Sequence, residues 1–198
     1  MVKVALGSPV RSLDSQIWTQ LKGLVYYAKL MVMPVGLNVE HPFAVADSPA
    51  QAAVLLSVLV LISAALLAWR GLSRWALFWL VWGGVSLAPT LLVPLNVLVN
   101  EHRLYLPLAG FAVLAGGGWS YLAHRASLRY AVLAALALAG ILGFYRNRVW
   151  ENELSLWGDA MAKSPGMPRV HVHLGNALRQ DRQLPRARAA YEAALALK

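Results

Sequence analysis

Apolar residues in this chain gather into long runs that short polar segments separate, a pattern typical of membrane helices. The clearest run covers residues 51–69, contains no charged side chain and has the ~20 residues that a helix needs to cross a bilayer core. Three later runs of similar character follow at residues 75–93, 104–121 and 130–145. The pattern therefore predicts at least four membrane-spanning helices in one all-α chain.

An earlier apolar stretch at residues 21–37 carries Lys22 and Lys29. The segment is either a span whose lysines extend toward the headgroups or a helix that lies flat at the membrane surface; we expect a span. Residues 1–20 are polar and are interpreted as an N-terminal segment. The membrane region then covers residues 21–148 and contains four or five helices.

The short turns between these runs differ in charge, which predicts how the chain is oriented in the membrane. Two turns are rich in arginine, and they contain Arg70, Arg74, Arg125 and Arg129. The loops at residues 38–50 and 96–103 have no such excess. Because positive loops stay in the cytoplasm, these two loops and the C-terminal region are expected on the opposite, outer face.

The C-terminal segment, residues 149–198, has the pattern of one and a half tetratricopeptide repeats. The positions at which this motif has small or packing residues are occupied by Leu174, Gly175, Ala187, Tyr191 and Ala194. One period of about 34 residues earlier, Trp157 stands in register with Tyr191, and Ala160 with Ala194. The expected structure is a short set of antiparallel helices after the membrane region.

Composition supports a membrane protein and argues against other classes. Hydrophobic residues make up 59% of the chain and charged residues 14%, against about 45–50% and about 25% in soluble domains. The net charge of +9 comes from scattered basic residues, so we expect no nucleic-acid partner. No metal site is expected, because cysteine is absent and His171 and His173 diverge by about 200° on a helix. No cofactor is evident either.

A polar cluster precedes the predicted span at residues 104–121. Glu101, His102 and Arg103 are consecutive, and Tyr105 follows. An arginine beside a histidine can bind a phosphate at headgroup depth, with the glutamate orienting the arginine or accepting a proton. Alternatively, the cluster is an ordinary interfacial cap in which the acid stabilises a helix start and the arginine and tyrosine anchor the interface.

The segment from Glu101 to Pro107 resembles the corresponding part of the transmembrane and tetratricopeptide-repeat O-mannosyltransferases and their bacterial relatives. The junction of residues 146–150, followed by Leu174-Gly175, is similar to the same family. In the animal members the basic residue follows the glutamate directly, whereas here His102 intervenes. The resemblance extends from about residue 12 onward.

This resemblance implies a GT-C glycosyltransferase architecture in the bacterial inner membrane. Such an enzyme takes a sugar, here mannose, from a polyprenyl-phosphate carrier and passes it to Ser or Thr of a protein that the repeats present. In the family a pair of acidic residues in the first outer loop supplies the base, and this chain has no Asp-Asp or Asp-Glu pair. We therefore expect the C-terminal part of such a transferase. The alternative is a non-catalytic, membrane-anchored scaffold whose repeats bind a partner polypeptide.

Overall fold

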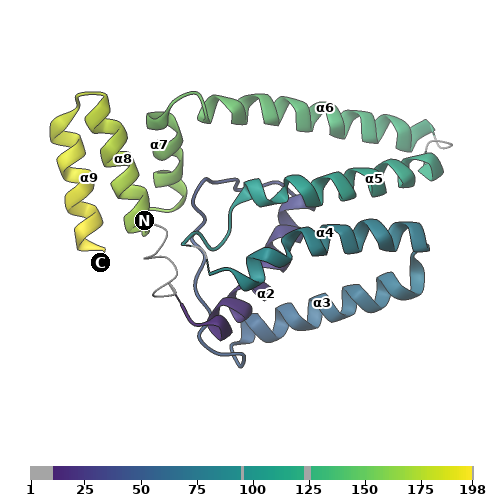
Figure 1. Ribbon diagram of the computed structural model, residues 1–198. Coiled ribbons are helices and arrows are strands. Elements are labelled where there is room, and N and C mark those ends of the chain that lie inside the picture. Colours follow the sequence, from purple (N-terminus) through teal and green to yellow (C-terminus); the bar gives the residue numbers. More distant parts are fainter. Residues whose placement is uncertain (1–10, 95, 123–125, 198) are drawn as a thin grey trace. The chain divides into compact units, whose positions relative to one another are not determined.

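A computed structural model describes residues 11–94, 96–122 and 126–197, in which every regular element is helical, as predicted (Figure 1). The predicted cytoplasmic residue Arg125 lies outside the described residues. The helices are α2 Leu13–Val32, α3 Ala52–Gly71, α4 Arg74–Leu92, α5 Tyr105–Leu122, α6 Ala126–Val149, α7 Glu153–Lys163, α8 Pro168–Gln180 and α9 Leu184–Ala196, with a 3-10 turn, η1, at Glu101–Leu104.

The chain divides into two compact units. The first, called the membrane unit, comprises Met1–Leu37 and Phe43–Gly117. The second, called the C-terminal unit, comprises Asn38–Pro42 and Gly118–Lys198. The loop at Asn38–Pro42 thus belongs with α6 to α9, which lie far along the chain from it.

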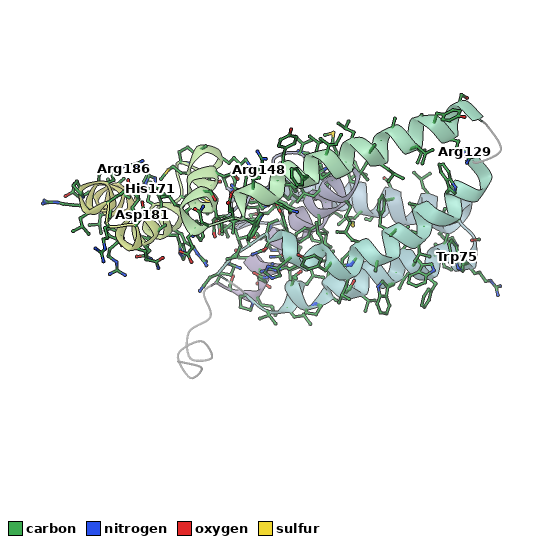
Figure 2. All side chains as sticks on the ribbon, turned by 90° about the horizontal axis from the view of Figure 1, so that it is seen from above. Trp75, Arg129, Arg148, His171, Asp181 and Arg186 are labelled. Atoms are coloured by element: carbon green, nitrogen blue, oxygen red, sulfur yellow. The ribbon has the colours of Figure 1, made fainter. Side chains whose placement is uncertain are left out.

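Three of the described helices are long and apolar enough to cross a membrane: α3, α4 and Ser127–Val149 of α6. Few of their side chains are buried within the protein, and in α6 none is, so lipid is the natural environment of these apolar surfaces. Arg129 lies near the start of α6 and Arg148 near its end (Figure 2), so these two charged side chains flank the apolar middle of the helix. These helices coincide with three of the predicted runs. The prediction of a span in α5 stays a prediction.

Helix α2 begins eight residues before the predicted apolar run and ends at Val32. Ser12 caps its start by accepting a hydrogen bond from the backbone of Ser15. Its first turns bury polar side chains, and these are Ser15, Gln16, Thr19 and Gln20. Hydropathy alone missed this part of the helix because polar residues occupy its inward face. The prediction that residues 21–37 cross the membrane stays a prediction.

Glycines allow α4 and α5 to pack closely. A Cβ atom at Gly110 would lie 2.9 Å from the backbone oxygen of Trp79, and one at Gly117 would lie 2.7 Å from the ring of Trp75. The order of these two contacts shows that α4 and α5 are antiparallel, and only a residue without a side chain permits so close an approach. The neighbouring Gly116 and Gly118 face open space, so of these three consecutive glycines only Gly117 makes a close contact with α4.

In the C-terminal unit, α7, α8 and α9 form a row of helices (Figure 1). Leu178, Ala187 and Ala190 form its core, with Leu174 and Tyr191 packed against them. The ring of Tyr191 lies over Gly175, and its hydroxyl donates to Asn176 Oδ1 at 2.7 Å. The predicted packing residues therefore lie between α8 and α9.

Ala160 of α7 and Ala194 of α9, which the sequence analysis placed in register, are both buried. Trp157 stacks on His173 with the ring centroids 4.1 Å apart, so its contact is made with α8. Asp159, also in α7, accepts hydrogen bonds from Arg146 and Lys163, each at 2.7 Å, and the bond from Arg146 ties α7 to the end of α6.

Replacing Gly175 with Ala is expected to destabilise the α8–α9 pair by about 1–3 kcal/mol. The new Cβ would lie 2.6 Å from the Tyr191 ring and would push it away from Asn176. Gly158→Ala is the matched control, because Gly158 is an exposed helix residue with nothing within 4 Å. Its helix should gain up to about 1 kcal/mol. Hydrogen exchange of α7–α9 measures both, and equal protection in the two variants would contradict the packing argument.

Candidate functional site

The predicted cluster at residues 101–105 forms the η1 turn and the first residue of α5, and α2 helps to hold this segment. The hydroxyl oxygen of Tyr27 accepts a hydrogen bond from the backbone N–H of Asn100 at 3.0 Å. The side chain of Asn100 in turn accepts from the backbone N–H of His102 at 3.2 Å. Tyr27 is fully buried, so the turn is anchored to the core of the membrane unit.

The guanidinium group of Arg103 folds back over its own loop. It donates to the carbonyl oxygens of Val97 at 2.8 Å and Leu98 at 3.0 Å. The side chain of Gln20 donates to the same Leu98 oxygen at 3.0 Å. These bonds use two of the five N–H donors of the arginine, and they hold the guanidinium group in one place.

A cleft of about 390 Å³ lies between the end of α4 and the start of α5. The residues that line it are Ser86, Pro89, Thr90, Val93, His102, Arg103, Tyr105 and Leu106. The structure thus brings three of the four predicted phosphate-binding residues to one cleft, whereas Glu101 lies in the same turn without lining it. A cleft with apolar walls and two basic side chains at a helix end suits an amphipathic anion.

Two residues that the sequence analysis did not single out lie behind this cleft. The buried side chain of Gln16 donates to the carbonyl oxygens of Thr90 at 2.6 Å and Val93 at 3.2 Å. These carbonyl groups lie at the C-terminal end of α4, where carbonyl oxygens have no hydrogen-bond partner within the helix. Arg11 donates to the amide oxygen of Gln16. The only signal in the sequence was the spacing of Gln16 and Gln20, which places two amides on one face of α2.

In the C-terminal unit, the loop at Asn38–Pro42 docks on the turn between α7 and α8. Asn38 donates from Nδ2 to Ser164 Oγ at 2.8 Å and to the Glu40 carbonyl at 2.7 Å. Ser164 Oγ donates to the same carbonyl at 2.8 Å. Asn38 and Ser164 are each 1% exposed, so these bonds form in a dry environment where unpaired polar groups are costly.

Glu40 is the ionisable group of this loop contact. Its carboxylate is almost fully buried and lies 3.5 Å from Nε of the exposed Arg169. Burial raises the pKa of Glu40, and the positive charges of Arg169 and His41 oppose that rise without cancelling it. The docked loop therefore holds a carboxylate in a place that favours its protonated form.

The two histidines of α8 have separate partners. His171 Nε2 lies 2.7 Å from the carbonyl oxygen of Pro165, whereas His173 stacks on Trp157. Burial and the charge of Arg169 lower the pKa of His173. Both side chains therefore belong to the packing of the helix row.

The long apolar helices and the similarity to known proteins together indicate a membrane protein. The chain is similar to part of the curated "Protein O-mannosyl-transferase TMTC3" of Homo sapiens, with 29% identity over 104 residues, or 50% of this chain and 11% of that protein. The Mus musculus protein of that name is 25% identical over 104 residues, with the same coverage. Tmtc3 of Drosophila melanogaster is 27% identical over 135 residues, or 64% of this chain and 15% of that protein.

The chain thus spans 11–15% of the length of these relatives. No protein-family model matches the chain, and no solved structure matches it. The similarity supports a relationship to the TMTC proteins.

Glu40→Gln is expected to raise the melting temperature at pH 7 and to have little effect at pH 4. Because the pKa of Glu40 is higher in the folded state, the stability linked to its protonation is fully present below the unfolded pKa. That stability is lost as the pH rises through the folded pKa. A gain of about 1 kcal/mol would correspond to about 2–4 °C.

The exposed Glu151 provides the control, Glu151→Gln, which should leave the melting temperature unchanged at both pH values. A lower melting temperature for Glu40→Gln at pH 7 would mean that pairing with Arg169 outweighs the cost of burying the carboxylate.

Proposed function

We propose that this chain forms part of an integral-membrane glycosyltransferase that moves mannose from a polyprenyl-phosphate carrier to Ser or Thr of a protein. The observation that carries the proposal is the similarity to the TMTC protein O-mannosyl-transferases. The cleft supports it, because basic and apolar groups meet there at a helix end, as a lipid-linked phosphate requires.

In this proposal the apolar wall of the cleft, formed by Pro89, Val93 and Leu106, holds the first part of the carrier chain. Arg103 and His102 hold its phosphate. When the sugar leaves, the phosphate gains a negative charge, and a fixed guanidinium group stabilises that charge most where water is excluded. The chain's own residues thus supply donor binding and leaving-group stabilisation.

The loop contact of the C-terminal unit supports a specific membrane topology. The loop Asn38–Pro42 contacts Ser164 and Arg169, so both segments lie on the same side of the membrane. The chain between them must therefore cross the membrane an even number of times, whereas α3, α4 and α6 would give three crossings. We therefore assign α5 as the fourth crossing, with α7–α9 on the outer face of a bacterial inner membrane, opposite the turn that contains Arg70 and Arg74.

In the same proposal, α7–α9 present the acceptor polypeptide as tetratricopeptide repeats. The second candidate function is a membrane-anchored scaffold, in which these helices bind a partner and the membrane helices only anchor them. The absence of an Asp-Asp or Asp-Glu pair from this sequence favours that candidate. Transfer activity separates the two.

Membranes that contain the chain together with any segment encoded upstream of it should transfer a radiolabelled sugar from polyprenyl phosphate to protein. Arg103→Ala is expected to lower the transfer rate at limiting donor by about 100-fold, the usual effect of losing one charge-stabilising donor. Arg70→Ala, at the opposite end of α3 and α4, should keep the rate. No transfer by the unaltered protein would instead support the scaffold.

The chain has no cysteine, so single introduced cysteines report topology directly. Cysteines at Ser48 and at the exposed Gly166 should react with a membrane-impermeant maleimide from the outer face. A cysteine at Gly71 should react only after the membrane is opened. Labelling of Ser48 and Gly166 from opposite sides would exclude α5 as a span.

A further inference from the structure

Helix α2 has the length of a membrane span but not the composition of one. It contains 20 residues, yet it is not among the three described helices that are apolar enough to cross a membrane. Lys22 and Lys29 lie within it, and polar side chains are buried along its first turns. A helix of this kind either crosses the membrane beside other helices or lies along the surface, and its contacts distinguish the two arrangements.

The hydrogen bonds of α2 reach segments at one end of α3 and α4. The residues that make these bonds extend from Ser15 to Tyr27, a distance of about 18 Å along the helix axis. Their partners belong to the loop before α3, to the last turn of α4 and to the segment that follows α4. The partners are Ala46 for Ser15 and Thr19, Thr90 and Val93 for Gln16, Leu98 for Gln20, and Asn100 for Tyr27.

The buried apolar contacts of α2 lie at the same end. Tyr27 and Leu30 belong to one buried cluster with Leu87, which lies in the last two turns of α4. The buried side chains of α3 are Val54 and Ser57, and both belong to the first two turns of that helix. A helix that crossed the membrane beside α3 would also cover its middle. Helix α2 therefore lies across the ends of α3 and α4 (Figure 1).

The residues around α2 fall on three sides of the helix. The buried residues occupy one side, which faces the ends of α3 and α4. A second side is apolar and follows the helical repeat of about 3.6 residues; it is formed by Leu13, Ile17, Leu21, Leu24, Ala28 and Met31. The third side carries Trp18, Lys22, Val25 and Lys29. Apolar and basic residues are thus separated around the helix, as in helices that lie along a membrane surface.

Both lysines lie beside aromatic rings. Lys22 Nζ is 5.3 Å from the centre of the Phe43 ring and donates to the carbonyl oxygen of Ala44 at 2.9 Å. Lys29 Nζ is 5.8 Å from the centre of the Tyr26 ring. Lysine and tyrosine side chains combine an apolar body with a polar tip, which suits the boundary between lipid and water.

The apolar surface continues beyond the end of α2. Val32 is 74% exposed and Val35 is 64% exposed, and the exposed Met33 lies between them in the sequence. At the end of α3 that α2 contacts, Leu55 and Leu56 are exposed as well. Exposed apolar surface of this extent marks an interaction site. Because α3 has lipid as its natural environment, lipid is also the partner that fits the apolar side of α2.

We propose that α2 lies along the outer surface of the membrane, with its apolar side and residues 32–35 inserted into the lipid beside the ends of α3 and α4. The side that carries Lys22 and Lys29 faces the headgroups and water. Both ends of α2 are then on the same side of the membrane as the loop before α3. This arrangement takes the place of the crossing that was expected at residues 21–37, and it does not depend on the proposed sugar transfer.

The first test is the side of the membrane on which α2 begins. Because the chain has no cysteine, the exposed Asp14 is replaced with Cys and treated with a membrane-impermeant maleimide. Asp14→Cys should react from the same side as Ser48→Cys, in the loop before α3. Gly71→Cys, at the far end of α3, should react only after the membrane is opened. An Asp14→Cys variant that reacts like Gly71→Cys would show that α2 crosses the membrane and that the proposal is wrong.

The second test compares consecutive residues of the full chain in liposomes by spin labelling of single cysteines. Neighbouring residues differ by about 1.5 Å along a helix axis but point about 100° apart. A helix that lies flat therefore separates them between lipid and water, whereas a crossing helix keeps them at one depth. Labels at Ile17 and Ala28 should be more accessible to oxygen, which concentrates in lipid. Labels at Trp18 and Lys29 should be more accessible to a water-soluble nickel complex.

Leu59 and Val60, two exposed residues in the middle of α3, form the control pair. Labels at both should be more accessible to oxygen, because α3 crosses the membrane. The two pairs of α2 lie about 16 Å apart along the helix, so each tests the arrangement independently if a variant of the other fails to fold.

Three results would overturn the proposal. Equal accessibility within each pair of α2, with a difference between the pairs, would mean that depth changes along α2 and that it crosses the membrane. Preference for nickel at all four positions would place α2 in water, away from the lipid. Exclusion of both reagents from Ile17 and Ala28 would mean that a protein surface covers the apolar side. None of these results bears on transfer of a sugar, which the radiolabel assay measures separately.

Discussion

The membrane unit depends on the hydrogen bonds that the polar face of α2 makes with irregular backbone. Ser15 donates to the Ala46 carbonyl and Thr19 accepts from the Ala46 N–H, both at 2.8 Å. Gln16 donates to the carbonyl groups of Thr90 and Val93 at the end of α4, and Gln20 donates to the carbonyl group of Leu98 in the segment that follows. Buried backbone N–H and C=O groups that lie outside regular helices need hydrogen-bond partners, and α2 supplies them here.

This constraint explains why the cleft has its position and its polarity. The segment between α4 and α5 leaves helical geometry, and the side chains of Gln16, Gln20 and Arg103 donate hydrogen bonds to carbonyl groups at the end of α4 and in this segment. The same groups that satisfy the backbone bring positive charge to the end of an apolar cleft. The side chains that donate hydrogen bonds to the backbone in this region are therefore in part the same ones that could bind an anion. A substitution of one of them affects both folding and binding.

The second constraint is the docked loop of the C-terminal unit. Asn38 and Ser164 are 126 residues apart and bond directly inside a buried contact. Two hydrogen bonds to one carbonyl and a weak ion pair hold a loop that leads toward the first apolar helix. This contact joins the segment before α3 to a segment after α6. It therefore restricts the number of membrane crossings more than hydropathy alone does.

The sequence by itself determined the all-α class and the three long apolar helices. These follow from a local signal, uncharged runs of bilayer length. It placed His102, Arg103 and Tyr105 at one helix end, but gave no reason to join Arg11 and Gln16 to them. Only the tertiary structure decided that link and the docking of Glu40, since both depend on hydrogen bonds between segments whose separation along the chain carries no periodic signal.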